Sequence, residues 1–85
     1  MSLPAHKVLE AARVQAGLST DELWLAYYAL GGMASPSLVR SYLSDGAAME
    51  PIDYDVLAQA INERFVERGG NHPVPYSDDL SPGPR

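Results

Sequence analysis

The chain has 85 residues, a formal net charge of −5 and no cysteine. A chain this short forms one domain with a small core, and it has neither disulfides nor a thiolate zinc site to strengthen that core. The acidic balance argues against non-specific binding to nucleic acid, which depends on Lys and Arg at phosphates. No apolar run is long enough to cross a bilayer, and the N-terminal stretch lacks the apolar region of a signal peptide. We therefore expect a cytoplasmic protein that does not bind membranes.

The segment 18–23, with the sequence LSTDEL, predicts the start of a helix. Ser19 can accept a hydrogen bond from the backbone N–H of Glu22, whose side chain can reach back to the N–H of Ser19, and this arrangement is a capping box. The predicted helix, about 20–30, has no polar face after its first turn. A helix that is apolar all round is either buried on all sides or covered by a partner. We therefore place it at the centre of the domain, with one face as a candidate for contact with another molecule.

Two further helices flank this one in the sequence. The first is expected from about Pro4 to Ala16, because proline suits a first helical position and Gly17 suits a left-handed residue just after the end. The other begins with Ser35 as N-cap and Pro36 at the first position, and Gly46 closes it. The apolar stripes at helical spacing are Val8, Leu9, Ala12 and Ala16 in the first helix, and Leu38, Val39, Tyr42 and Leu43 in the other.

A last helix is expected from Asp53, the best N-cap residue, to about Arg68, with Pro51 as an alternative, earlier start. Its apolar stripe consists of Val56, Leu57, Ala60, Ile61 and Phe65. No window alternates long enough to predict a strand. The predicted fold class is therefore all-α: a small bundle of four short helices with an extended, Pro-rich C-terminal tail.

The expected boundary lies between a helical domain, residues 1–70, and the tail, residues 71–85. The tail holds four of the seven prolines. Because proline fixes its own φ and restricts the residue before it, we expect the tail to be extended and, toward its end, disordered. Val74 and Tyr76 are the tail residues that are expected to fold back onto the helices.

The aromatic residues Trp24, Tyr27, Tyr28 and Tyr42 are the candidate protein-interaction residues, since Trp and Tyr are frequent in binding hot spots. Trp24 and Tyr28 lie one turn apart and share a helix face, whereas Tyr27 and Leu30 lean to another face. Three thin neighbouring helices cannot bury both pairs. We expect one pair in the core and the other as an exposed anchor or a dimer seam. The alternative is that all of them are core residues whose hydroxyls reach solvent.

The order of the helices also resembles the helix-turn-helix of the phage-repressor type. The sequence LEAARVQAGLSTDEL (9–23) looks like the first two helices of that family. SPSLVRSYLSDG (35–46) stands in the place of its recognition helix, and VLAQAINERF (56–65) in the place of the helix that follows. The chain departs from the family in the bulky aromatic residues of its second helix and in a longer turn at 31–34.

The resemblance implies a function for the first turns of the helix that begins at Pro36. Ser35, Ser37, Arg40 and Ser41 would face bases and phosphates there, because Ser bonds phosphate or a base edge and Arg binds guanine at two points. Only Arg40 brings positive charge to that helix, whereas a typical interface needs several phosphate contacts. The alternative is that Ser35 only caps the helix and that Arg40 is solvated.

Neither metal binding nor catalysis is predicted. The acidic cluster Asp45, Glu50, Asp53 and Asp55 lacks the regular ligand ladder of a calcium site, although it is a candidate surface for a basic partner. The two histidines, His6 and His72, have no ligand spacing to a carboxylate. There is no phosphate-binding glycine loop and no nucleophile elbow. We therefore expect no metal, no cofactor and no enzymatic activity.

The functional hypothesis is a small non-enzymatic regulatory protein that acts through protein contacts, either with a second copy or with another protein. The surplus of aromatic and apolar side chains on a small acidic domain motivates it. Transcription control in a bacterium is the expected setting, and the excess of Arg over Lys is typical of a GC-rich genome. The alternative hypothesis is a divergent helix-turn-helix protein that binds a specific DNA sequence.

Overall fold

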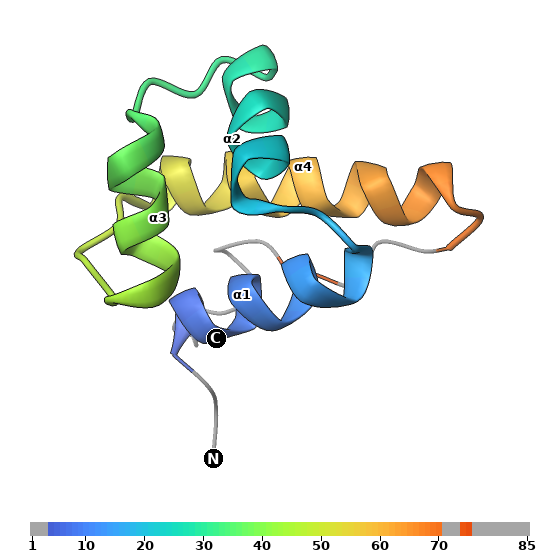
Figure 1. Ribbon diagram of the computed structural model, residues 1–85, viewed down its shortest axis with the longest axis horizontal. Helices are drawn as coiled ribbons and strands as arrows, with labels where there is room; N and C mark the ends of the chain where they lie inside the picture. Colours follow the sequence, from blue (N-terminus) through green and yellow to red (C-terminus); the bar gives the residue numbers. More distant parts are fainter. Residues whose placement is uncertain (1–3, 71–73, 76–85) are drawn as a thin grey trace, which may run out of the picture.

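The computed structural model describes residues 4–70 and 74–75, which contain four helices (Figure 1). In chain order these are α1 (Ala5–Ala16), α2 (Thr20–Ala29), α3 (Pro36–Ser44) and α4 (Pro51–Glu67). No strand occurs within the described ranges. The structure confirms the all-α fold class and the predicted order of the helices.

The longest helix is α4, and two of the other helices pack directly against it. Both α1 and α2 pack against α4, and α3 packs against α1 and α2. Figure 1 shows α4 running across the molecule, with α2 crossing it upright and α1 lying below. The prediction that α2 lies at the centre is wrong, because α1 packs mainly against α3 and α4 and the C-terminal end of α2 extends beyond α4.

The core is built from one stripe of each helix and from one residue after α4. The predicted stripes of α1, α3 and α4 supply most of it, although Leu38 remains exposed. Tyr54 and Ala58 of α4 are buried as well, outside the predicted stripe. The buried hydrophobic residues are Leu9, Ala12, Ala16, Leu23, Tyr27, Val39, Tyr42, Leu43, Tyr54, Leu57, Ala58, Ala60, Ile61 and Val74.

The predicted ends of α2 and α3 and the C-terminal end of α1 are confirmed, whereas α1 begins at Ala5 and Pro4 precedes it as the N-cap residue instead of filling the first helical position. The backbone N–H of Glu22 donates to Ser19 Oγ over 3.0 Å, and Glu22 Oε1 accepts from the N–H of Ser19 over 2.8 Å, so the capping box is complete. Gly17 follows α1 with a φ of 73°, a conformation that side chains disfavour. Ser35 Oγ accepts from the N–H of Leu38 at the start of α3.

The start of α4 differs from the best prediction. The helix begins at Pro51, the alternative start, and the residue before it, Glu50, makes no side-chain cap. Asp53 lies in the first turn and does not cap the helix. Its carboxylate instead accepts hydrogen bonds from the hydroxyls of Tyr27 and Tyr42, so the side chain binds two core residues and not the backbone at the start of the helix.

Hydrogen bonds connect residues 74–75 to α4. Val74 is buried, as expected, and the side chain of Asn62 bonds both its N–H, over 2.9 Å, and its C=O, over 3.0 Å. The hydroxyl of Tyr54 donates to the C=O of Pro75 over 2.8 Å. The hydrophobic core therefore extends beyond residue 70. The predictions for Tyr76 and for residues 77–85 lie outside the described residues.

Candidate protein-interaction surface

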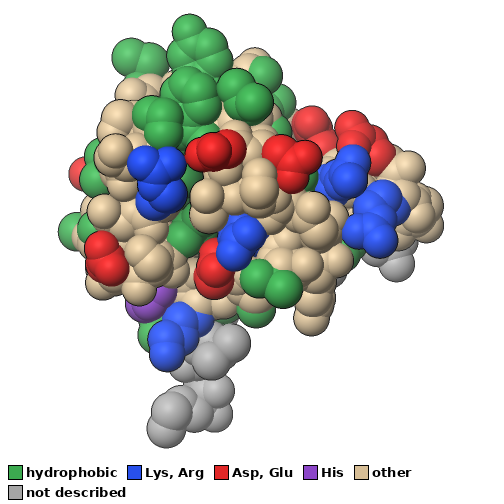
Figure 2. Space-filling view, in the orientation of Figure 1, with side chains coloured by type: hydrophobic (Ala, Val, Ile, Leu, Met, Phe, Trp, Pro, Cys, Tyr) green, Lys and Arg blue, Asp and Glu red, His purple; other side chains and the backbone are tan. Residues whose placement is uncertain are grey.

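Four apolar residues of α2 and of the loop after it form an exposed surface, which we call the α2 surface: Trp24, Leu25, Tyr28 and Met33. Leu25 is 60%, Tyr28 63% and Met33 93% exposed, and Trp24 is half-buried. Figure 2 shows hydrophobic side chains gathered at the top of the molecule, over the C-terminal end of α2 and the following loop. The sequence has no charged residue between Glu22 and Arg40. Exposed apolar patches of this kind mark interaction sites.

An aromatic pair forms the rigid part of the α2 surface. The four-residue spacing brings Trp24 and Tyr28 onto the same side of the helix, where their rings stack with centroids 5.2 Å apart and planes 21° apart. The indole Nε1–H of Trp24 donates to the C=O of Ala34 over 2.9 Å. The loop therefore holds the indole in place, and little conformational freedom remains for a partner to remove.

The loop that carries Met33 is itself fixed by Tyr27. The Tyr27 hydroxyl accepts hydrogen bonds from the backbone N–H groups of Met33, over 3.1 Å, and Ala34, over 2.8 Å. The same hydroxyl donates to Asp53. Gly32 lies so close to the ring of Tyr27 that a Cβ at this position would overlap it. One buried tyrosine thus determines the path of the loop and the position of Met33.

Tyr27 and Tyr42 belong to the core and not to the exposed surface. Tyr27 has no exposed side-chain surface and Tyr42 is almost fully buried. Burial, assisted by the nearby carboxylate of Asp53, raises the pKa of Tyr42 to about 12 and also raises the pKa of Tyr27. Both hydroxyls therefore stay protonated at neutral pH and act as donors. The structure thus separates the aromatic candidates into a buried pair and a surface pair, Trp24 and Tyr28.

The residues expected to contact DNA lie together at the start of α3. Ser35 caps the helix, Ser37 and Arg40 are exposed, and Ser41 is half-buried. The guanidinium of Arg40 forms an ion pair with Asp21 over 3.4 Å, and it also donates to Ser37 Oγ over 3.5 Å. The one positive charge of this helix is therefore paired with a carboxylate of α2.

The other arginines do not extend the positive charge of Arg40. Arg13 pairs with its own helix neighbour Glu10 over 2.6 Å, and Arg64 pairs with Glu67 over 3.7 Å. Arg68 donates to the C=O of Ala16, at the far end of α1. Figure 2 shows basic and acidic side chains interspersed across the visible face. That face therefore has no continuous basic patch for a phosphate backbone.

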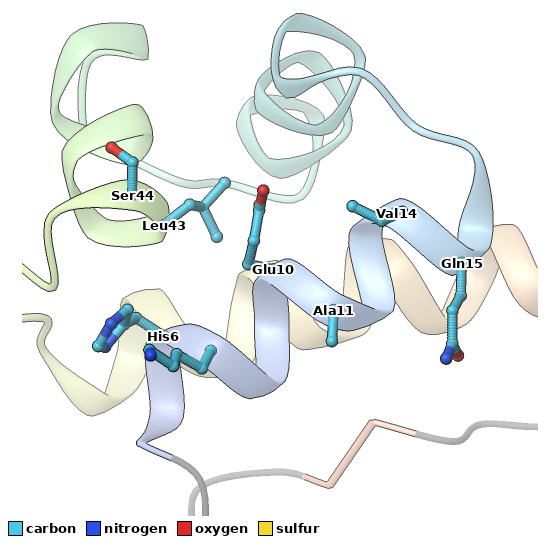
Figure 3. Close-up of a pocket in the computed structure, with 8 residues that line it drawn as sticks. His6, Glu10, Ala11, Val14, Gln15, Leu43 and Ser44 are labelled. Atoms are coloured by element: carbon cyan, nitrogen blue, oxygen red, sulfur yellow. The ribbon is translucent and has the colours of Figure 1, made fainter.

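An open groove lies along α1, away from the C-terminal end of α2, which is at the top of Figure 1. It runs along α1 to the end of α3 and has a volume of about 680 Å³ (Figure 3). Its lining residues are His6, Lys7, Glu10, Ala11, Val14, Gln15, Leu43 and Ser44. No pattern in the sequence predicts this groove, because it depends on how the end of α3 packs against α1.

No family model, no curated protein and no solved structure matches the chain. Among the described residues, no group of three or more His, Asp or Glu side chains is placed to hold a metal ion. Of the helices in the described part, none combines the length and apolar character that a membrane span requires.

Proposed function

We propose that the protein is a non-enzymatic regulatory module that acts through protein contacts made by its α2 surface. The observation that carries the proposal is the stacked, loop-fastened pair Trp24 and Tyr28 beside the exposed Leu25 and Met33. Rigid aromatic residues at a surface supply large contact areas at a low entropic cost, and they dominate binding hot spots.

Self-association is the simplest form of this function. An exposed apolar surface on a small domain becomes buried when a second copy covers it, and burial of apolar area contributes about 25 cal/mol per Å². A role in transcription control is part of the proposal, and it rests on the resemblance of the chain to helix-turn-helix proteins.

Size-exclusion chromatography with light scattering, over a range of concentrations, tests the proposal. We expect the mass of the wild type to rise with concentration, whereas the double variant Leu25→Gln, Tyr28→Ser stays monomeric. Both substitutions are at exposed positions and neither changes the charge. The matched control is Val66→Gln, an exposed apolar residue on the last turn of α4. A double variant that associates like the wild type would exclude the α2 surface as the interface.

The alternative function is sequence-specific DNA binding through α3. The exposure of Ser37 and Arg40 on the first turns of that helix favours it. The ion pair between Arg40 and Asp21 counts against it, because a phosphate or guanine would have to displace a carboxylate. Protein contact is therefore the better-supported function.

A further inference from the structure

We infer that the protein associates head to tail, with the α2 surface of one copy seated in the α1–α3 groove of the next copy. This inference rests on the proposed function, because it specifies which two surfaces meet. It differs from a symmetric dimer, in which the same patch of both copies would be buried.

The shapes of the two surfaces differ in the way that a head-to-tail contact requires. The α2 surface lies at the tip where the C-terminal end of α2 projects beyond α4, and α1 lies at the opposite side of the molecule (Figures 1 and 2). The groove along α1 is a shallow, open depression with a volume of about 680 Å³. A projecting surface has more contact with a shallow depression than with a second projecting surface.

The floor of the groove suits the apolar side chains of the α2 surface. Ala11 and Val14 lie on successive turns of α1, and Leu43 points from α3 toward α1 (Figure 3). Val14 is 61% exposed, so the groove, like the α2 surface, leaves apolar area in water. Contact between the two would bury both exposed areas together, whereas a symmetric pair of α2 surfaces would leave Val14 uncovered.

The charges at the margins of the two surfaces are complementary. Within residues 4–70 and 74–75, Lys7 is the only Lys or Arg side chain without an ion pair or hydrogen bond, and it lines the groove. Two acidic residues lie near the loop of the α2 surface. Asp53, in the first turn of α4, accepts a hydrogen bond from the Tyr27 hydroxyl, which also holds the loop at Met33. The exposed Glu50 directly precedes α4. A head-to-tail contact brings a free cation on one copy toward an acidic margin on the other.

Mixing two complementary variants tests this inference. The α2-surface variant is Leu25→Gln, Tyr28→Ser, and the groove variant is Ala11→Gln, Val14→Gln, with all four positions exposed. We expect each variant alone to be monomeric at concentrations at which the wild type associates. The equimolar mixture should give a complex of two chains and no larger species. The α2 surface of the groove variant is intact and can bind the intact groove of the α2-surface variant, and no further pair of intact surfaces remains to extend the complex. Val66→Gln is again the control, and circular dichroism verifies that each variant is folded.

The outcomes separate the inference from the proposed function. A groove variant that associates like the wild type overturns the head-to-tail arrangement but leaves the α2 surface as the interface. A mixture that stays monomeric also overturns it. A wild type that is monomeric at every concentration overturns both self-association and this inference.

A charge exchange provides a second test that does not alter the apolar surfaces. Lys7→Glu and Glu50→Lys are substitutions at exposed positions, so the fold is retained. Each alone is expected to weaken association by about two- to fivefold, the size of an exposed ion pair. The two variants mixed should associate more strongly than either alone. Equal association of the single variants, the mixture and the wild type would contradict the proposed pairing of the two margins.

Discussion

The hydroxyl of Tyr27 donates a hydrogen bond of 2.7 Å to the carboxylate of Asp53. The second oxygen of this carboxylate accepts from the hydroxyl of Tyr42 over 3.0 Å. One acidic side chain in the first turn of α4 therefore joins α2 and α3 to that helix. Since Tyr27 also fastens the loop at Met33, the same carboxylate indirectly holds the α2 surface.

Removing this carboxylate should destabilise the fold. Asp53→Ala leaves the hydroxyls of Tyr27 and Tyr42 without their acceptor, and each unsatisfied buried group costs about 1–3 kcal/mol. We expect the free energy of unfolding, measured by urea denaturation, to fall by at least about 1 kcal/mol, the lower limit for one unsatisfied hydroxyl. The control Asp45→Asn changes an exposed carboxylate and should stay within about 0.5 kcal/mol of the wild type. Equal stability of the two variants would show that the Asp53 bonds contribute nothing.

Stability should also fall at high pH. The pKa of Tyr42 is raised from its ordinary value of 10.0 to about 12 by burial and by Asp53, and the pKa of Tyr27 is raised for the same reasons. Because the folded state holds these protons more tightly, their contribution to stability is complete below pH 10 and is lost as the pH rises toward 12. Urea denaturation between pH 8 and pH 11 measures this slope. Tyr42→Phe should make the slope shallower, and an unchanged slope would contradict the assignment.

The predictions from sequence succeeded where the signal was local. The capping box at Ser19 and the left-handed Gly17 depend on residues within one turn of each other, so their pattern is visible in the chain. The role of Asp53 was missed because its partners lie 26 and 11 residues away and no spacing rule connects them. A residue in a first turn looks the same in sequence whether it caps its own helix or accepts from another helix.

The candidate site could be predicted only as a choice between two faces of α2. The sequence placed Trp24 with Tyr28 and Tyr27 with Leu30, and the structure shows that Tyr27 is buried and Tyr28 exposed. Which pair is buried depends on the direction from which α4 crosses α2, and the periodicity of α2 contains no information about that direction. The groove along α1 was not predicted for the same reason.

Gly32→Ala should be strongly destabilising although the residue does not have a left-handed backbone. A Cβ at this position would overlap the aromatic ring of Tyr27, which hydrogen bonds hold in place. Overpacking of this kind costs about 1–3 kcal/mol. The comparison is Gly70→Ala, whose Cβ would lie 3.1 Å from the C=O of Phe65 and requires only a small adjustment. Thermal unfolding followed by circular dichroism should show a clearly lower Tm for Gly32→Ala, and equal Tm values would contradict the overlap.

The contact between Asn62 and Val74 should stabilise the segment after α4. Asn62 is buried, and its amide bonds both the N–H and the C=O of Val74. In Asn62→Leu the branching at Cγ is kept but the polar atoms are lost, so the two backbone groups lose their partners at about 1–3 kcal/mol each. We expect faster amide hydrogen exchange at Val74 and lower overall stability. Gln59→Leu, at an exposed position one turn earlier, should leave the exchange rate at Val74 unchanged.

Arg40→Ala distinguishes the two proposed functions. If the protein acts through the α2 surface, the variant should self-associate like the wild type, because an exposed ion pair contributes only about 0.2–1 kcal/mol. We also expect no mobility shift of a random-sequence duplex pool by the wild type at low salt. The DNA-binding alternative predicts instead a shift that weakens steeply with salt and is lost in Arg40→Ala. Arg64→Ala, which also breaks an ion pair of a partly exposed arginine, is the matched control. If Arg40→Ala abolished a shift that Arg64→Ala retained, α3 would be the functional surface, and the α2 surface would be left with a role in pairing DNA-binding copies.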